Sequence, residues 1–199
     1  GLPVIVASYG FEGCENLRNV IISEGVTTIG YRAFAVCPNL QHINIPSSVM
    51  NFGGRIASGC MQLKSVTMSG EIYVIDFNAF DGAFGYTIYL ERGGVSEGDW
   101  MFLGSMSTFC YVVTGCTFSE DNTYVVSVVY DSNTVVYNQN YQPIDGYWID
   151  PPYREGYIFA GWATTENGAG YLGEGVLLSG GIPEGTRLYA TWEPIEESL

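Results

Sequence analysis

The first half of the chain repeats itself every 23 residues, and this period constrains the fold more than any other feature. Cys14, Cys37 and Cys60 mark the period, because the same step separates each from the next. Three apolar columns keep that step: Leu17, Leu40 and Leu63; Val20, Ile43 and Val66; Ile22, Ile45 and Met68. A repeat of this length cannot bury its apolar face alone, so it must stack on its neighbours. The sequence therefore predicts a solenoid.

Each repeat contains one short predicted strand. In the second repeat, Ile43 and Ile45 alternate with polar residues, as in a strand with one buried face. The residues between them are expected to face solvent and to form a ligand-binding face. Across the repeats these outward positions are Asn19, Ile21, His42, Asn44, Ser65 and Thr67.

The period predicts about four coils of a leucine-rich type over residues 2–91. The last coil is irregular: Ala83 stands where the others have cysteine, and Ile88 and Leu90 point inward only if that repeat is one residue shorter. Terminal repeats are often atypical because they cap the stack. At the start, Val6 and Phe11 already fit the second half of a repeat, so we expect the chain to be a piece of a longer protein.

Residues 92–122 break the pattern and are predicted to form a junction. They contain an apolar cluster from Trp100 to Phe109, which we expect to cap the open end of the solenoid, since flexible linkers are polar. Residues 123–193 follow a different pattern of strand-forming runs bounded by turn residues. These runs are Val125–Tyr130, Thr134–Tyr137, Tyr157–Trp162 and Arg187–Trp192. The sequence thus predicts a mainly β chain, with a small β-rich module after the solenoid.

The solenoid resembles the BspA-type leucine-rich repeats of bacterial surface proteins. The phrase Ala-Phe-x-x-Cys-x-x-Leu-x-x-Ile-x-Ile-Pro-x-x-Val, which occupies residues 33–49, carries the likeness. Ala57 and Ala83 depart from it, at a phenylalanine and a cysteine position respectively. The resemblance implies a stack of short coils on a secreted or wall-attached protein.

The C-terminal module resembles the internalin B-type repeat, a small β-grasp-like domain of bacterial cell-wall proteins. The likeness rests on Pro-Tyr-Arg-Glu-Gly-Tyr-Ile-Phe-Ala-Gly-Trp at residues 152–162 and on Leu-Tyr-Ala-Thr-Trp at residues 188–192. This resemblance also implies a bacterial cell surface. It further implies that Phe159, Trp162 and Trp192 form the module's core rather than a platform for stacking carbohydrate, whereas Tyr147, Trp148 and Tyr153 remain candidate contact residues.

The charge balance argues against two classes of partner. The chain has 7 Lys+Arg against 21 Asp+Glu, a net charge of −14, so a phosphate backbone or an anionic membrane would repel it. Its apolar runs are shorter than the roughly 18 residues that span a bilayer. We therefore expect no nucleic-acid partner and no membrane insertion.

The cysteines suggest a metal site at first sight. On stacked coils, however, Cys14, Cys37 and Cys60 would form a straight row about 4.8 Å apart instead of a tetrahedron. We expect them to pack as small, reduced apolar side chains, with no metal or cofactor. Cys110 and Cys116, close together in the junction, are the candidate disulfide, and the sequence leaves open whether they are bonded.

Three further motifs have simple structural interpretations. Gly168–Gly173 fits a dinucleotide-binding pattern, but no helical period follows it, so we expect a glycine-rich loop between strands. The single histidine, His42, has no carboxylate in its own repeat to orient it, so a surface histidine is expected rather than a catalytic one. Carboxylates gather in turns without the spacing of a calcium loop, so we expect solubilising charges, with structural calcium as the alternative.

These observations lead to a hypothesis about function. We expect a non-enzymatic, extracellular bacterial surface protein that binds a host or neighbouring-cell protein or glycan through the outward strand positions. The alternative is a rigid spacer that presents another domain of a longer surface protein. An enzyme is the least favoured class, because the sequence contains no recognisable acid/base or nucleophile arrangement.

Overall fold

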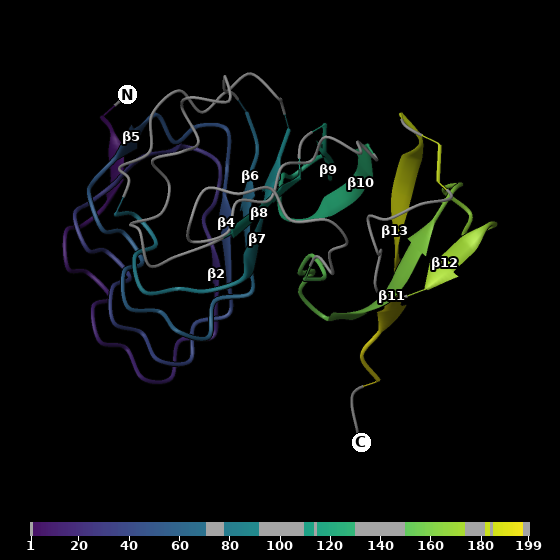
Figure 1. Ribbon diagram of the computed structural model, residues 1–199. Helices are drawn as coiled ribbons and strands as arrows, with labels where there is room; N and C mark the ends of the chain where they lie inside the picture. The colour runs from purple at the N-terminus through teal and green to yellow at the C-terminus, as the bar shows by residue number, and fades with distance from the viewer. Residues whose placement is uncertain are drawn as a thin grey trace.

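A computed structural model describes residues 2–70, 78–91, 110–113, 115–129, 150–173, 182–183 and 185–196. Its regular secondary structure consists of strands, and no helix occurs in the residues it describes (Figure 1). The mainly β class predicted from the sequence is confirmed.

One side of the solenoid is formed by a five-stranded parallel sheet. Its strands, in order across the sheet, are β2 (Asn19–Ile21), β4 (His42–Ile45), β6 (Ser65–Met68), β7 (Tyr86–Leu90) and β8 (Cys110–Val113). The register pairs Asn19 with His42, His42 with Ser65, and Ser65 with Thr87. The step from β6 to β7 is one residue shorter than the two steps before it, because Val66 lies beside Ile88. This agrees with the shorter repeat expected from the positions of Ile88 and Leu90.

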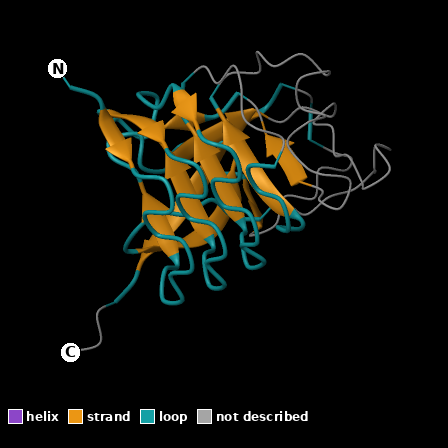
Figure 2. Ribbon diagram, turned by 90° about the vertical axis from the view of Figure 1, so that its left-hand side faces the viewer, coloured by secondary structure: helices purple, strands orange, loops and turns teal. Residues whose placement is uncertain are grey.

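A second, smaller parallel sheet lies on another side of each coil. It contains β1 (Val4–Val6), β3 (Val26–Ile29) and β5 (Asn51–Phe52). Turns connect the two sheets, and Figure 2 shows them as a regular series of loops stacked side by side. The 23-residue period is thus the length of one turn of the coil.

The cysteine column packs inside the coils, as predicted. Cys37 and Cys60 are fully buried with free thiols, and Cys14 is partly buried at the first coil. Each buried thiol also donates a hydrogen bond to the preceding coil: Cys37 Sγ to the Phe11 carbonyl at 3.1 Å and Cys60 Sγ to the Phe34 carbonyl at 3.2 Å. Burial raises the pKa of Cys60 to about 12, so this side chain stays a neutral thiol.

Glycine is required where the backbones of neighbouring coils touch. A Cβ atom on Gly30 would lie 2.4 Å from the backbone nitrogen of Ser8, and one on Gly53 would lie 2.3 Å from that of Tyr31. Both distances are far below a van der Waals contact, and the neighbours are backbone atoms that cannot rotate away. A larger residue at either position would push the coils apart.

We predict that Gly53→Ala destabilises the chain by about 3 kcal/mol, because the added methyl group forces neighbouring coils to separate. Gly25→Ala is the control, since Gly25 has a φ of 96° and nothing within 4 Å of its Cβ position. This control should cost only about 1 kcal/mol, the price of the left-handed backbone. Urea unfolding of both variants measures the difference, and equal costs would rule out the close backbone contact.

A second backbone constraint recurs at the turn before each cysteine position. Gly13, Gly59 and Gly82 have positive φ angles there, and Val36 occupies the equivalent position with a φ of 57°. This conformation is strained for a β-branched residue. Val36 is also 49% exposed, so its side chain gains little from burial.

We predict that Val36→Gly stabilises the chain by about 1 kcal/mol, because it relieves the left-handed strain. The matched control is Val26→Gly, in strand β3, where the same change should destabilise because a strand side chain that packs against the core is lost. Thermal unfolding monitored by circular dichroism checks both, and a lower melting temperature for Val36→Gly would contradict the strain argument.

The C-terminal part forms its own five-stranded sheet. The strands, in order across it, are β12 (Tyr171–Gly173), β11 (Tyr157–Ala163), β13 (Arg187–Pro194), β10 (Val125–Val129) and β9 (Thr117–Phe118), all paired antiparallel. Trp162 and Leu188 are buried in its core. The core also contains Tyr89 and Val113, which belong to the solenoid sheet.

The two sheets therefore extend beyond the predicted boundaries. Strand β8 continues the solenoid sheet past residue 91, and β9 joins the C-terminal sheet before residue 123. The predicted strand Thr134–Tyr137 and the apolar cluster Trp100–Phe109 lie outside the described residues. The expected loop between strands is found for the first half of the glycine-rich motif, between β11 and β12, whereas its second half forms strand β12.

The candidate disulfide between Cys110 and Cys116 is not formed, and both thiols are free. Cys110 packs against the solenoid core, whereas Cys116 is buried in the core of the C-terminal sheet. The two side chains belong to different cores, so closeness in sequence does not bring the sulfurs together.

Candidate functional site

The outward side chains of the solenoid sheet form a surface that we call the strand face. It consists of Asn19, Ile21, His42, Asn44, Ser65, Thr67, Thr87 and Tyr89. Within it, the first outward position of each strand is polar in four neighbouring strands. This set is the polar row: Asn19, His42, Ser65 and Thr87.

The expectation that these positions face solvent is wrong for three of the six predicted residues. Asn44 is 4% exposed, Ser65 1% and Thr67 3%. Only Asn19, on the edge strand β2, is classed as exposed, while Ile21 and His42 are half-buried. The physical reason is that the C-terminal part of the chain packs against this side of the solenoid, next to β7 and β8 (Figure 1).

The first contact across the strand face involves the backbone of Asp150. Its amide donates a hydrogen bond to Thr87 Oγ1 at 2.9 Å. Its carbonyl accepts one from the hydroxyl of Tyr89, which is fully buried. Strand β7 therefore binds both the amide and the carbonyl of Asp150.

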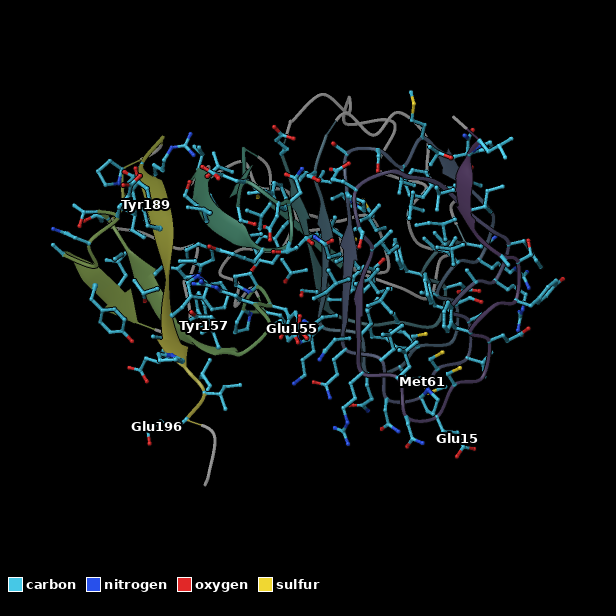
Figure 3. All side chains as sticks on the ribbon, turned by 180° about the vertical axis from the view of Figure 1, so that it is seen from behind. Glu15, Met61, Glu155, Tyr157, Tyr189 and Glu196 are labelled. Carbon is cyan, nitrogen blue, oxygen red and sulfur yellow. The ribbon has the colours of Figure 1, made fainter. Side chains whose placement is uncertain are left out.

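The second contact involves Tyr153. Its ring stacks on the imidazole of His42, with ring centroids 4.8 Å apart and an interplanar angle of 18°. Asn19 Nδ2 donates a hydrogen bond to the Tyr153 hydroxyl at 3.1 Å. In the view of Figure 3, Glu155, which follows closely in the chain, lies between the solenoid strands and Tyr157 of the C-terminal sheet.

The third contact lies at the other end of the strands and involves Asn122. Asn44 Nδ2 donates to the Asn122 carbonyl at 2.6 Å, and Asn122 Nδ2 donates to Glu24 Oε1 at 2.9 Å. Burial alone would raise the pKa of Glu24, but hydrogen bonds from Ser47 and Asn122 outweigh it and lower the pKa. The charged carboxylate therefore supports this contact.

The environment of His42 keeps it neutral. Burial lowers the pKa of the imidazole to about 4, with a further contribution from the positive charge of Lys64. His42 Nδ1 is 2.7 Å from Ser65 Oγ, so the ring is held from one side by a hydroxyl and from its face by Tyr153. A protonated imidazole would have to leave this position, or the folded state would lose stability because a charge is buried there.

We predict that protonation of His42 destabilises the fold. Its pKa is about 4 in the folded chain against 6.5 for an ordinary histidine, so its contribution is complete above pH 6.5 and is lost as the pH falls through 4. The difference corresponds to roughly 3 kcal/mol. Denaturant unfolding of wild type and of His42→Gln between pH 7.5 and pH 3.5 measures it.

His42→Gln lacks the titrating group, so it should lose less stability on acidification than wild type does. Titrating carboxylates contribute equally to both proteins and cancel in the difference. Parallel stability curves for the two proteins would contradict a buried, neutral His42.

His42 and Ser65 are residue types that can act as a base and a nucleophile, and they are hydrogen-bonded. A substrate, however, has no access to this pair. Ser65 is 1% exposed, so no substrate reaches its hydroxyl in this arrangement. Among the described residues, no three His, Cys, Asp or Glu side chains lie close enough together to hold a metal ion. In this arrangement the Ser65 hydroxyl is therefore closed to a substrate.

The aromatic residues of the C-terminal part are arranged as a core. Trp162 is 1% exposed. Phe159 packs edge-on against both Trp162 and Trp192, with ring centroids 5.3 and 5.4 Å apart respectively. The expectation of a core is confirmed for Trp162. Tyr147 and Trp148 lie outside the described residues.

Three contact residues were not identified from the sequence. Tyr89, Asn122 and Asp150 contact residues far away in the chain, and Asn122 is 78 residues from Asn44. For Tyr89 a signal exists: a large aromatic residue stands where the neighbouring strands carry Asn44 and Thr67. An apolar residue at an outward position indicates that something covers it.

Comparison with known proteins gives one match. The profile of a family described as the BspA type leucine rich repeat region matches residues 4–106 in six copies, which is just over half of the chain. Neither curated proteins nor solved structures gave a match. In the described part of the chain, no helix has the length and apolar character needed to cross a membrane.

Proposed function

The chain belongs to the BspA-type leucine-rich repeat family, and from this premise we propose that it is a non-enzymatic recognition protein of the bacterial cell surface, secreted or wall-attached. Its partner is a protein or glycan of a host or neighbouring cell. The strand face is the recognition surface: Asn19, Ile21 and His42 lie at its more accessible end, whereas Asn44, Ser65 and Thr67 take part only when the covering part of the chain is displaced.

One observation carries this proposal: the polar row presents hydrogen-bonding side chains in register on neighbouring strands. Asn19, His42, Ser65 and Thr87 are aligned by the parallel pairing, and three of them contact Asp150 or Tyr153 directly. A surface that holds a segment of its own chain has the hydrogen-bonding groups to hold a partner. Asn19, on the edge strand, is the exposed end of this row.

The second candidate is a rigid spacer. It is favoured by the way in which the C-terminal part is attached, through Asp150, Tyr153 and Asn122 and through the shared packing of Tyr89 and Val113. A short, stiff unit of this kind would suit the presentation of another domain. In that case the strand face serves to join the two parts and has no external ligand.

We further propose that the C-terminal part is an internalin B-type, β-grasp-like module. Its two signature phrases fall on β11 and β13, which are neighbouring antiparallel strands. The aromatic residues of these phrases meet in one core, where Phe159 lies opposite Trp192. This arrangement supports a module of the same setting, the bacterial cell wall.

We predict that the full chain captures at least one partner from a panel of host extracellular proteins and glycans. Asn19→Ala combined with His42→Ala should weaken that binding about tenfold, because both side chains lie at the accessible end of the strand face. Arg55→Ala, at an exposed turn position away from that face, is the control and should leave binding unchanged. Surface plasmon resonance with immobilised panel members measures all three.

An empty panel for wild type would favour the spacer. Binding that responds to Arg55→Ala and not to the double variant would place the recognition surface elsewhere on the solenoid.

A further inference from the structure

A short segment of the chain crosses the strand face from one strand to the next. We call residues 150–153 the crossing segment. Asp150 is held by Thr87 and Tyr89 of β7, while Tyr153 lies on His42 of β4 and reaches Asn19 of β2. The segment thus runs across the strands and not along them, and it follows the polar row.

The distance between the strands that the crossing segment joins requires it to be extended. Strands β7 and β2 are three neighbour spacings apart, which is about 14 Å at the usual strand separation. Three residues of extended chain span about 10 Å, and the tyrosine side chain covers the remainder. Pro151 and Pro152 favour this shape, because each proline fixes its own φ and keeps the preceding residue extended.

The contacts made by the strand face suit a peptide better than a sugar. The solenoid satisfies the amide and the carbonyl of one residue, Asp150, and then holds the ring and the hydroxyl of a tyrosine three residues later. Pro152, between them, is buried. A prolyl segment that is already extended loses little conformational entropy when it docks.

Charge complements this pattern. Lys64 is exposed, next to Ser65 of the polar row. Burial raises the pKa of Asp150, and the positive charge of Lys64 opposes that rise. An acidic residue at the start of the segment is therefore matched by the basic side chain beside the row.

We propose that the polar row is a binding site for extended acidic Asp-Pro-Pro-Tyr peptides, and that the crossing segment occupies it as an internal ligand. This rests on the proposed function, since it names the class of partner for the same face. A partner that carries such a segment competes with residues 150–153 and displaces them. The internal segment is present at an effective concentration on the order of millimolar, so the intact chain binds a free peptide weakly.

The experiment uses the full chain and a fluorescein-labelled synthetic peptide with the sequence of residues 149–156. Tyr153→Ala removes the stacking and the hydroxyl of the internal ligand, so the internal segment competes less with a free peptide. Fluorescence anisotropy should show that Tyr153→Ala binds the peptide about tenfold more tightly than wild type does. A peptide with alanine at its tyrosine position should show no binding to either protein.

Further variants assign the binding to the polar row. In the Tyr153→Ala background, Asn19→Ala with His42→Ala should weaken peptide binding about tenfold. Arg55→Ala in the same background is the control and should leave it unchanged. Peptide affinity that is equal in wild type and Tyr153→Ala, or that is insensitive to the Asn19 and His42 changes, overturns the proposal.

A conservative variant covers the case in which Tyr153→Ala fails to fold. Tyr153→Phe keeps the ring on His42 and loses only the hydroxyl bonded to Asn19, so it should bind the peptide about fivefold more tightly than wild type. An affinity of Tyr153→Phe equal to that of wild type overturns the proposal as well.

The outcome is separable from that of the proposed function. If panel partners bind through Asn19 and His42 but the peptide does not bind Tyr153→Ala, the recognition role stands and the peptide class is wrong. If the peptide binds Tyr153→Ala and the panel is empty, the site exists and the proposed host or neighbouring-cell partners are wrong.

Discussion

Parallel backbone pairing between successive coils holds equivalent residues side by side, and the other features of the molecule depend on it. It places the thiol of Cys60 under the carbonyl of Phe34 and brings the backbone of Gly53 against that of Tyr31. The same alignment turns single outward positions of separate repeats into a continuous row, in which His42 is 2.7 Å from Ser65. The repeat thus produces a continuous row, and residues 150–153 of the same chain contact it.

The strand face changes character along the solenoid, and this change determines where the C-terminal part docks. The second outward position is Asn44 in β4 and Thr67 in β6, but Tyr89 in β7 and Val113 in β8. The apolar end contributes to the core of the C-terminal sheet, whereas the polar end makes hydrogen bonds. Residues 150–153 then run from β7, at the apolar end, toward β4 and β2 at the polar end.

Much of the fold could be predicted from the sequence because its causes are local and repeated. The period, the packing of Cys37 and Cys60 and the shortened step before Ile88 all follow from spacing. The covering of the strand face could not be predicted, because Asn44 and Thr67 have the polar side chains expected of a surface in water. Asn44 contacts Asn122, which is 78 residues away in the chain, and no local pattern encodes a contact of that range.

The chain's own crossing segment lies on the strand face, through Asp150 and Tyr153. The most direct measurement is a nuclear Overhauser experiment between the rings of His42 and Tyr153, whose centroids are 4.8 Å apart. His42 is the single histidine of the chain, so its ring signals need no assignment among several. We expect cross-peaks between the His42 and Tyr153 ring protons in the full chain at neutral pH. Their absence from a spectrum in which both rings are otherwise observed would show that the crossing segment does not lie on His42.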